Sequence, residues 1–169
     1  MTQVRAAVPA DADEVARVHV RSWQSAYRGL IAQEYLDGLK PEVWANRYTF
    51  GRVGLRMAST LVAVEGSAIR GLATTGLCRD QDFPNFGELM AIYVDPAHVR
   101  TGIGRLLMTA ARERLRLVGV TGALLWVLDG NVGARRFYEY DGWRFDGACR
   151  TVTFGNPPVK QVRYRCAPV

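Results

Sequence analysis

Two long segments carry hydrophobic residues at helical spacing, and each is bounded by residues that start or stop helices. The first covers 11–27, where Asp11 and Glu14 have the spacing of a capping box. The second begins at Gly102 and stops at the glycines of 119–122, with an apolar face of Ile103, Leu107, Ala111, Leu115 and Val118. Shorter helices are predicted at 32–39, from Pro41 to about 48, and from Asn131 to Gly142.

Shorter segments with alternating or continuous apolar residues predict strands. They cover 4–8, 60–64, 68–77, 88–94, 123–128, 143–154 and 159–166. The nearly all-apolar segment 123–128 is typical of a strand that is covered on both faces. Strands and helices mixed in this order predict a single α/β domain over residues 1–169, built around one sheet.

The composition is that of a folded protein in a reducing compartment. Of the 169 residues, 49% are hydrophobic, which supplies a core and argues against disorder. No stretch approaches the ~20 apolar residues of a membrane span, and residues 1–9 lack an apolar run of signal-peptide length. We therefore expect a cytoplasmic protein with no membrane partner. Cys78, Cys149 and Cys166 are scattered, so we expect free thiols and no metal site.

The net charge of +6 comes almost entirely from arginine, since Lys40 and Lys160 are the only lysines. A basic protein favours an anionic partner, either a nucleic acid or a phosphorylated cofactor. The arginines are spread along the chain without a long basic block, which disfavours nucleic acid as the partner.

Residues 88–107 read ELMAIYVDPAHVRTGIGRLL and predict a strand, a loop with two glycines and a helix. Gly102 and Gly104 let backbone N–H groups approach a ligand closely. The first turn of the helix adds unpaired N–H donors and the positive end of the helix dipole, and Arg100 and Arg105 add charge. This arrangement is typical of a phosphate cradle, although two glycines by themselves also suit an ordinary turn.

A second segment, residues 131–143, reads NVGARRFYEYDGW, and the two segments together resemble the acetyl-CoA signature of the GNAT superfamily. The pattern V-x-P-x-x-[QR]-x-x-G-x-G is matched at Val94, Pro96, Gly102 and Gly104. The pattern N-x-x-A-x-x-F-Y-x-x-x-G-[FW] is matched at Asn131, Ala134, Phe137, Tyr138, Gly142 and Trp143. Val99 replaces the usual Gln or Arg; this removes a side-chain contact but keeps the backbone amide that the cradle uses.

The resemblance implies a mixed, mostly antiparallel sheet flanked by helices, with coenzyme A lying where the parallel strands 88–94 and 123–128 splay apart. It implies acetyl-CoA as cosubstrate, no metal, and transfer of acetyl to an amine by direct attack in a ternary complex. It leaves a homodimer open. The implied cofactor-binding residues are Ile92, Tyr93, Val94, Val99, Arg100, Thr101, Gly102, Ile103, Gly104, Arg105, Asn131, Ala134, Phe137 and Tyr138.

In these roles, the backbone of 92–94 pairs with the pantetheine arm like an added strand, and one of its N–H groups polarises the thioester oxygen. Asn131 hydrogen-bonds the pantetheine amide, and Ala134 and Phe137 pack beside the arm. Tyr138 is the candidate general acid, because the equivalent tyrosine of the family reaches the sulfur and a phenol with a pKa near 10 suits donation to a thiolate. A tyrosine that only packs is the alternative.

Glu88 is the candidate base that takes the proton of the acceptor's ammonium group, directly or through water. Strand alternation predicts that it lies on the same side as Met90, Ile92 and Val94. The alternative is an ordinary solvated glutamate, with water as the base.

For the acceptor pocket, the candidates are Trp23, Tyr27, Phe86 and Glu88, although aromatic residues at helical spacing also suit a core. We expect Trp126, His19 and His98 to be structural. The acceptor itself stays open among small amines, amino-acid analogues, aminoglycoside-like antibiotics and protein N-termini. The alternative function is a non-catalytic acyl-CoA-binding or regulatory module on the same fold, which the presence of both Tyr138 and Glu88 disfavours.

Overall fold

The computed structural model describes residues 1–52, 54 and 57–169, and it contains a seven-stranded sheet in the order β1-β2-β3-β4-β5-β7-β6. The strands are β1 (Thr2–Ala6), β2 (Ser59–Glu65), β3 (Ala68–Leu77), β4 (Gly87–Val94), β5 (Ala123–Leu128), β6 (Arg144–Val152) and β7 (Val159–Cys166). The pair β4–β5 is parallel and the other neighbours are antiparallel. The predicted mixed, mostly antiparallel sheet is therefore confirmed.

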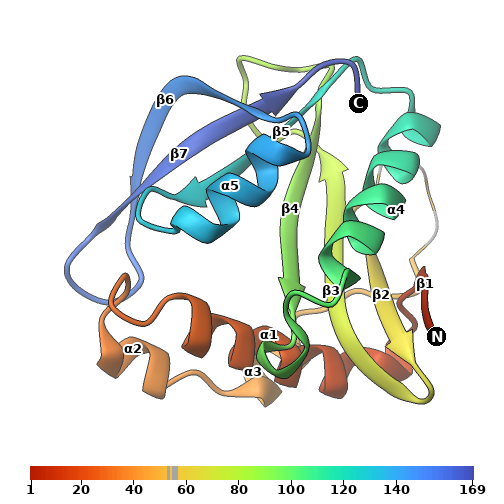
Figure 1. The fold of residues 1–169 in the computed structure, drawn as a ribbon, viewed down its shortest axis with the longest axis vertical. Helices are drawn as coiled ribbons and strands as arrows, with labels where there is room; N and C mark the ends of the chain where they lie inside the picture. The colour runs from red at the N-terminus through yellow and green to blue at the C-terminus, as the bar shows by residue number, and fades with distance from the viewer. Residues whose placement is uncertain (53, 55–56) are drawn as a thin grey trace.

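The helices are α1 (Ala12–Ala26), α2 (Gln33–Asp37), α3 (Pro41–Ala45), α4 (Ile103–Val118) and α5 (Val132–Tyr140), with short 3-10 turns η1 (Pro9–Asp11) and η2 (Pro96–His98). All the predicted helices are present, but α3 ends before Tyr48. In Figure 1, α4 and α5 lie in front of the sheet, and α1, α2 and α3 gather at its lower end. Among the described residues, no helix has both the length and the apolar character of a membrane span.

The two faces of the sheet have separate hydrophobic cores. On one face, the apolar stripe of α4 and Tyr138 of α5 pack against Leu125, Val127 and Trp143. On the other face, α1 and α2 bury Val15, Val18, Trp23 and Leu36 against β2, β3 and β5. The predicted apolar stripe of α4 is thus the side that covers the sheet, and its arginines face outward or sideways.

The capping box predicted from Asp11 and Glu14 is wrong. The Asp11 carboxylate accepts the backbone N–H of Val8 at 2.8 Å and pairs with the Arg5 guanidinium at 2.7 Å. The Glu14 carboxylate accepts the N–H of Ile69 on β3 at 2.8 Å. Asp11 therefore satisfies a donor at the start of η1, and Glu14 satisfies a donor of the sheet instead of the local one that a capping box requires.

The strands β4 and β5 diverge soon after they begin. Their register contains only the pairs Gly87–Ala123 and Glu88–Leu124, after which β5 turns away from β4 (Figure 1). Beyond these pairs, the edge of β4 that faces β5 has no strand partner among the described residues. The gap between the two strands therefore connects one face of the sheet with the other. This is the splayed geometry that the resemblance implies.

A β-bulge changes the face on which β4 presents its side chains. The register to β3 shifts between Thr74–Ala91 and Thr75–Leu89, so Met90 is an extra residue in β4. Leu89, Ile92 and Val94 consequently all pack on the core beneath α4, which strict alternation would forbid. Glu88 lies on the opposite face, and the prediction that it shares a side with Ile92 and Val94 is wrong because alternation was extended across the bulge.

Candidate active site

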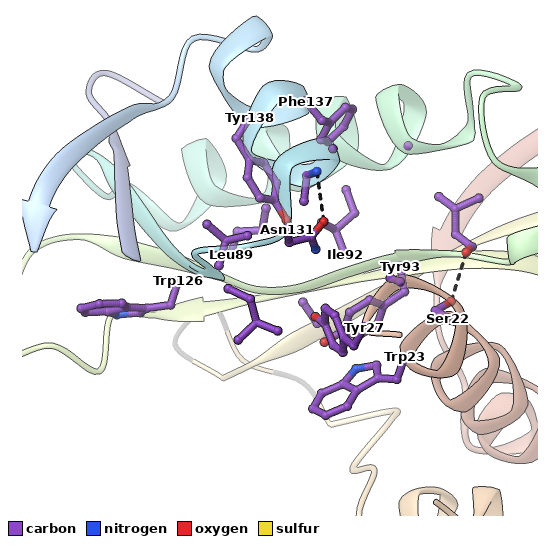
Figure 2. Close-up of a pocket in the computed structure, with 18 of the residues that line it drawn as sticks. Ser22, Trp23, Tyr27, Leu89, Ile92, Tyr93, Trp126, Asn131, Phe137 and Tyr138 are labelled. Atoms are coloured by element: carbon purple, nitrogen blue, oxygen red, sulfur yellow. Dashed lines mark hydrogen bonds between the residues drawn. The ribbon is translucent and has the colours of Figure 1, made fainter. Parts of the chain in front are cut away.

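A cleft of about 1010 Å³ runs through the gap between β4 and β5 and reaches both faces of the sheet. One part is lined by α4, α5 and the loop before α4, and the other by α1, β5, β6 and β7. Figure 2 shows Phe137, Tyr138 and Asn131 on one side of β4, and Trp23, Tyr27 and Trp126 on the other. We call the first part the loop-side chamber and the second part the far chamber.

The loop before α4 forms the closed end of the loop-side chamber. Gly102 is the N-cap of α4 with a φ of +89°, and the space where a Cβ would lie is open. The first helical hydrogen bond runs from Leu106 N–H to Gly102 C=O at 3.1 Å. The N–H groups of Ile103, Gly104 and Arg105 therefore have no acceptor within the helix and are available to an anion. This matches the predicted cradle.

The side chains around the cradle have different positions. Val99, Arg100, Gly102, Gly104 and Arg105 line the chamber, whereas the side chain of Ile103 is buried in the core beneath α4. Thr101 does not line the chamber; its hydroxyl donates to the His98 carbonyl at 2.5 Å and so closes the loop on itself. Arg100 has a φ of +62°, and together with Gly102 it gives the loop two left-handed residues that curve its backbone.

The free edge of β4 offers backbone groups at alternate residues. Asp95 N–H donates to Arg70 C=O on the β3 side at 2.8 Å, so the N–H groups of Ile92 and Val94 point the opposite way, towards the gap, and that of Tyr93 towards β3. The Val94 carbonyl already accepts the Ser22 hydroxyl of α1 at 3.0 Å (Figure 2). Ile92 therefore has the freest backbone groups of the three predicted residues, while the Tyr93 side chain lines the far chamber.

Asn131 and the start of α5 form the opposite wall. The Asn131 side chain accepts the N–H of Ala134 at 3.3 Å, which confirms the predicted cap (Figure 2). This bond uses the carboxamide oxygen, so the amide NH₂ stays available as a donor to a ligand. Ala134 and Phe137 line the same wall, and Gly133 and Arg136 join them, which the sequence interpretation had missed.

Tyr138 is buried beside the gap and lines the cleft, with 9% of its surface exposed. Burial raises the pKa of its phenol above the usual 10, and the nearby Tyr93 adds to the effect. Burial likewise raises the pKa of Tyr27 and of Tyr93, so the three phenols around the gap keep their protons at neutral pH. The cleft thus contains a neutral O–H donor next to the free edge of β4.

Glu88 is buried in the far chamber and paired with an arginine. Its side chain is 3% exposed, and Oε2 accepts the Arg79 guanidinium at 2.5 Å while Oε1 accepts the Arg79 backbone N–H at 3.1 Å and Nε–H at 3.2 Å. The pairing with Glu88 raises the pKa of Arg79, so the guanidinium stays charged. Oε2, with a single donor, keeps room for one more hydrogen bond in the cleft.

The far chamber also contains residues that the sequence interpretation had missed or treated as packing. Trp126, Arg150 and Gln161 line it, together with Trp44 and Phe154. Trp126 was expected to be structural; its indole N–H does bond Asp80 at 3.1 Å, but its ring forms part of the wall. Alternation along β5 was a usable signal, because Leu125 and Val127 face the α4 core and Trp126 must face the other way.

Of the residues predicted to line the acceptor pocket, Trp23, Tyr27 and Glu88 do line the cleft. Phe86 does not. Its ring packs on Phe83 with centroids 4.8 Å apart and closes over Gly122, because the loop before β4 folds back against the start of β5. His19 is buried between Tyr48, Trp44 and Tyr93, and its Nδ1 lies 2.9 Å from the Tyr48 hydroxyl, which agrees with a structural role.

Within the part of the chain that the structure describes, no cluster of three or more His, Cys, Asp and Glu side chains could hold a metal ion. Cys78, Cys149 and Cys166 are free thiols, and none of the three lines the cleft. The groups that the cleft offers for chemistry are therefore backbone and side-chain amides, phenols, serine hydroxyls, the Glu88 carboxylate and several guanidinium groups.

Comparison with known proteins agrees with this geometry. The model of the acetyltransferase (GNAT) family matches residues 20–143. The chain is 30% identical over 132 residues to the uncharacterized N-acetyltransferase YuaI of Bacillus subtilis, which covers 78% of this chain and 74% of the relative. It is 29% identical over 173 residues to the probable N-acetyltransferase Rv2775 of Mycobacterium tuberculosis, which covers 98% of this chain and 95% of the relative.

Among solved structures, the fold is similar to that of the PaiA N-acetyltransferase from Thermoplasma acidophilum in complex with coenzyme A. The TM-score is 0.75 at 18% identity, and the match covers 99% of each chain. At this level of identity the likeness concerns the fold.

Proposed function

The chain belongs to the acetyltransferase (GNAT) family and is an acyltransferase, and we propose that it transfers the acetyl group of acetyl-CoA to a primary amine of a small molecule or a protein N-terminus. In this proposal the amine attacks the thioester directly while both substrates are bound. The observation that carries it is the gap between β4 and β5, which joins a chamber suited to a diphosphate to a chamber suited to an amine.

The loop-side chamber suits coenzyme A. The three first-turn N–H groups of α4 and the side chains of Arg100 and Arg105 provide donors and positive charge for the pyrophosphate. The free edge of β4 at Ile92 and the amide of Asn131 provide donors and acceptors along the pantetheine arm. Ala134 and Phe137 supply apolar contact. This path runs from the cradle to the gap, where the thioester meets the bulge of β4.

The bulge at Met90 and the Tyr138 phenol act on the thioester. An N–H of β4 at the bulge, unpaired to β3, donates to the carbonyl oxygen as negative charge develops there. Tyr138 donates its proton to the departing sulfur. The raised pKa of Tyr138 keeps its proton on the phenol before the reaction. Burial also disfavours a bare thiolate, so a proton shared between the phenol oxygen and the sulfur stabilises both.

Glu88 accepts the proton that the amine loses, directly or through one water. Oε2 accepts one N–H of Arg79 and can accept one more hydrogen bond. The pairing with Arg79 holds the carboxylate in one orientation. Trp23 and Tyr27 border the chamber on the α1 side.

The test is release of free thiol from acetyl-CoA in the presence of an amine panel, with mass spectrometry of the acceptor. We expect release to depend on the amine and each acetylated product to gain one acetyl group. Calorimetry with coenzyme A is run in parallel. Tight binding of coenzyme A without thiol release across the panel would favour the non-catalytic acyl-CoA-binding module instead.

A further inference from the structure

The wall of the far chamber carries two arginines, Arg79 and Arg150, and the carboxylate of Glu88. Of the charged residues on its wall, Glu88 is paired with Arg79, which leaves Arg150. Arg163 and Arg165, on the neighbouring strand β7, are both paired with Asp146, and Arg163 also with Asp80. Among the described residues, Arg150 has no carboxylate within ion-pair distance.

Arg150 is nevertheless held in a defined position. Its Nε–H donates to Gln161 Oε1 at 2.7 Å, and its guanidinium lies over the Trp126 ring at 4.2 Å from the centroid. These contacts use one N–H and one face of the guanidinium, so four N–H donors are left for a partner. Partial burial lowers the pKa of Arg150, although the Asp80 and Glu88 carboxylates act in the opposite direction.

A planar guanidinium that is stacked on an indole and keeps a free edge is suited to a bidentate carboxylate. Glu88 lies in the same chamber and offers one acceptor to an ammonium group. We propose that the acceptor is an amine that also carries a carboxylate, and that Arg150 is the specificity-determining residue that binds this carboxylate while the amine points to Glu88 and the gap. This inference rests on the proposed function, which it narrows to amino-acid-like acceptors.

The same charges disfavour polyamines. A polycation in the far chamber would place its second ammonium group near Arg79 or Arg150. Among the described residues, the one acid on this wall is Glu88, which is already paired. Like charges in a partly buried chamber repel each other more strongly than in water. A chamber built for a polyamine would instead carry carboxylates without arginine partners.

The experiment compares each amino acid with the amine that remains when its carboxylate is removed, and adds spermidine and cadaverine. Thiol release from acetyl-CoA gives kcat and KM. We expect the best acceptor to be a carboxylate-bearing amine, with kcat/KM at least about 10-fold above that of its decarboxylated partner. Arg150→Gln should raise KM for the carboxylate-bearing member about 10-fold or more and leave kcat/KM for the decarboxylated member within about twofold.

Arg150→Lys keeps the charge without the fork and should restore part of the loss. Arg17→Gln, an exposed arginine of α1 outside the cleft, is the matched control and should change neither constant. Equal kcat/KM for the two members of each pair, a preference for spermidine, or an unchanged KM in Arg150→Gln would each overturn the inference and leave the acetyltransferase proposal standing.

Binding separates the two proposals if no acceptor is turned over. Absence of thiol release would contradict the proposed function. Calorimetry of the coenzyme A-loaded protein with the same amino acids then decides the inference by itself. Binding that is lost in Arg150→Gln and kept in Arg17→Gln would support a carboxylate site at Arg150, and no binding to either protein would overturn it.

Discussion

Tyr138 and His19 are both buried near Tyr93, and burial decides the protonation of each. Tyr138 and His19 form no ion pair within the described part of the chain, and burial favours their neutral forms. Glu88 is more deeply buried, and its carboxylate accepts three N–H donors of Arg79. A neutral phenol and a carboxylate held by an arginine therefore line the same cleft.

Tyr138→Phe removes one hydroxyl and little volume. If Tyr138 delivers the proton to sulfur, kcat should fall about 100-fold or more while coenzyme A affinity hardly changes. Because its pKa is raised above 10, deprotonation of Tyr138 should cause no loss of activity below about pH 10. Tyr140→Phe, an exposed position on the same helix, is the control. An undiminished kcat in Tyr138→Phe, measured with a good acceptor, would assign Tyr138 to packing alone.

Glu88→Gln keeps the shape of the side chain and removes the base. The rate should fall most at neutral pH, where the amine is mainly protonated, and recover as pH rises towards the pKa of the amine, near about 10 for an alkyl ammonium. The measurement is the pH profile of kcat/KM with one acceptor, with Glu113→Gln on the exposed face of α4 as control. Superimposed profiles would exclude Glu88 as the base; a uniform loss at every pH would instead assign it to positioning the acceptor.

His19 makes the fold sensitive to acid. Burial lowers its pKa from 6.5 to about 4, so the unfolded chain binds a proton at a higher pH than the folded chain does. The neutral, buried His19 contributes roughly 3 kcal/mol to the free energy of unfolding. This contribution is fully present above about pH 6.5 and is lost as pH falls towards 4. Urea unfolding at pH 7, 5.5 and 4.5 should show this loss in wild type and in His98→Gln but a smaller one in His19→Phe. Parallel pH dependences in all three proteins would refute it.

At the scale of elements, the bulge of β4 and the first turn of α4 make the cleft. The bulge reverses the faces of β4, so Leu89 packs beneath α4 while Glu88 enters the far chamber. Gly102 ends the loop in a left-handed conformation that a residue with a Cβ rarely adopts, which turns the first N–H groups of α4 towards the chamber. The bulge lies in β4 and Gly102 lies at the start of α4, so both belong to one strand–loop–helix unit.

Gly104→Glu should weaken coenzyme A binding severely, because it adds bulk and negative charge to the cradle. The same is expected of Gly102→Glu, but at that residue the positive φ adds backbone strain to the loss. Gly104→Ala is the sharper control, since its Cβ would lie 3.5 Å from the Phe137 ring, an ordinary contact, and binding should nearly persist. Calorimetry measures all three variants, and an affinity of Gly104→Glu equal to that of Gly104→Ala would refute the cradle.

For the whole molecule, the sheet separates the two chambers and the gap connects them. The α4 and α5 side provides the loop-side chamber, and the α1 side, with β5 to β7, provides the far chamber. Both β4 and β5 border the two chambers, because Leu89 and Val127 lie on the α4 side whereas Glu88 and Trp126 lie on the other. The arrangement favours attack through the gap over an acetyl group stored on the protein.

Direct transfer predicts kinetics of a ternary complex. Initial rates with varied acetyl-CoA and amine should give intersecting double-reciprocal lines, and labelled coenzyme A should not exchange into acetyl-CoA without an acceptor. Cys78→Ala tests whether the thiol that follows β3 stores the acetyl group. The rate should be unchanged, since Cys78 does not line the cleft. Parallel lines with exchange would indicate a covalent intermediate and contradict direct attack.

The sequence alone determined the elements and the cofactor side of the site. Periodicity located the strands and helices, since each one buries a face of its own. The cradle and the Asn131 cap followed from residues adjacent in the chain, because backbone donors at a helix start need no distant partner. Only the tertiary structure decided the far chamber. Arg79, Trp126 and Arg150 come from three separate segments, and the sheet order β4-β5-β7-β6 brings them to one wall of the cleft. The face of Glu88 depended on a one-residue bulge that hydrophobic alternation does not reveal, and Phe86 and Glu14 took partners that only the folded sheet brings near them.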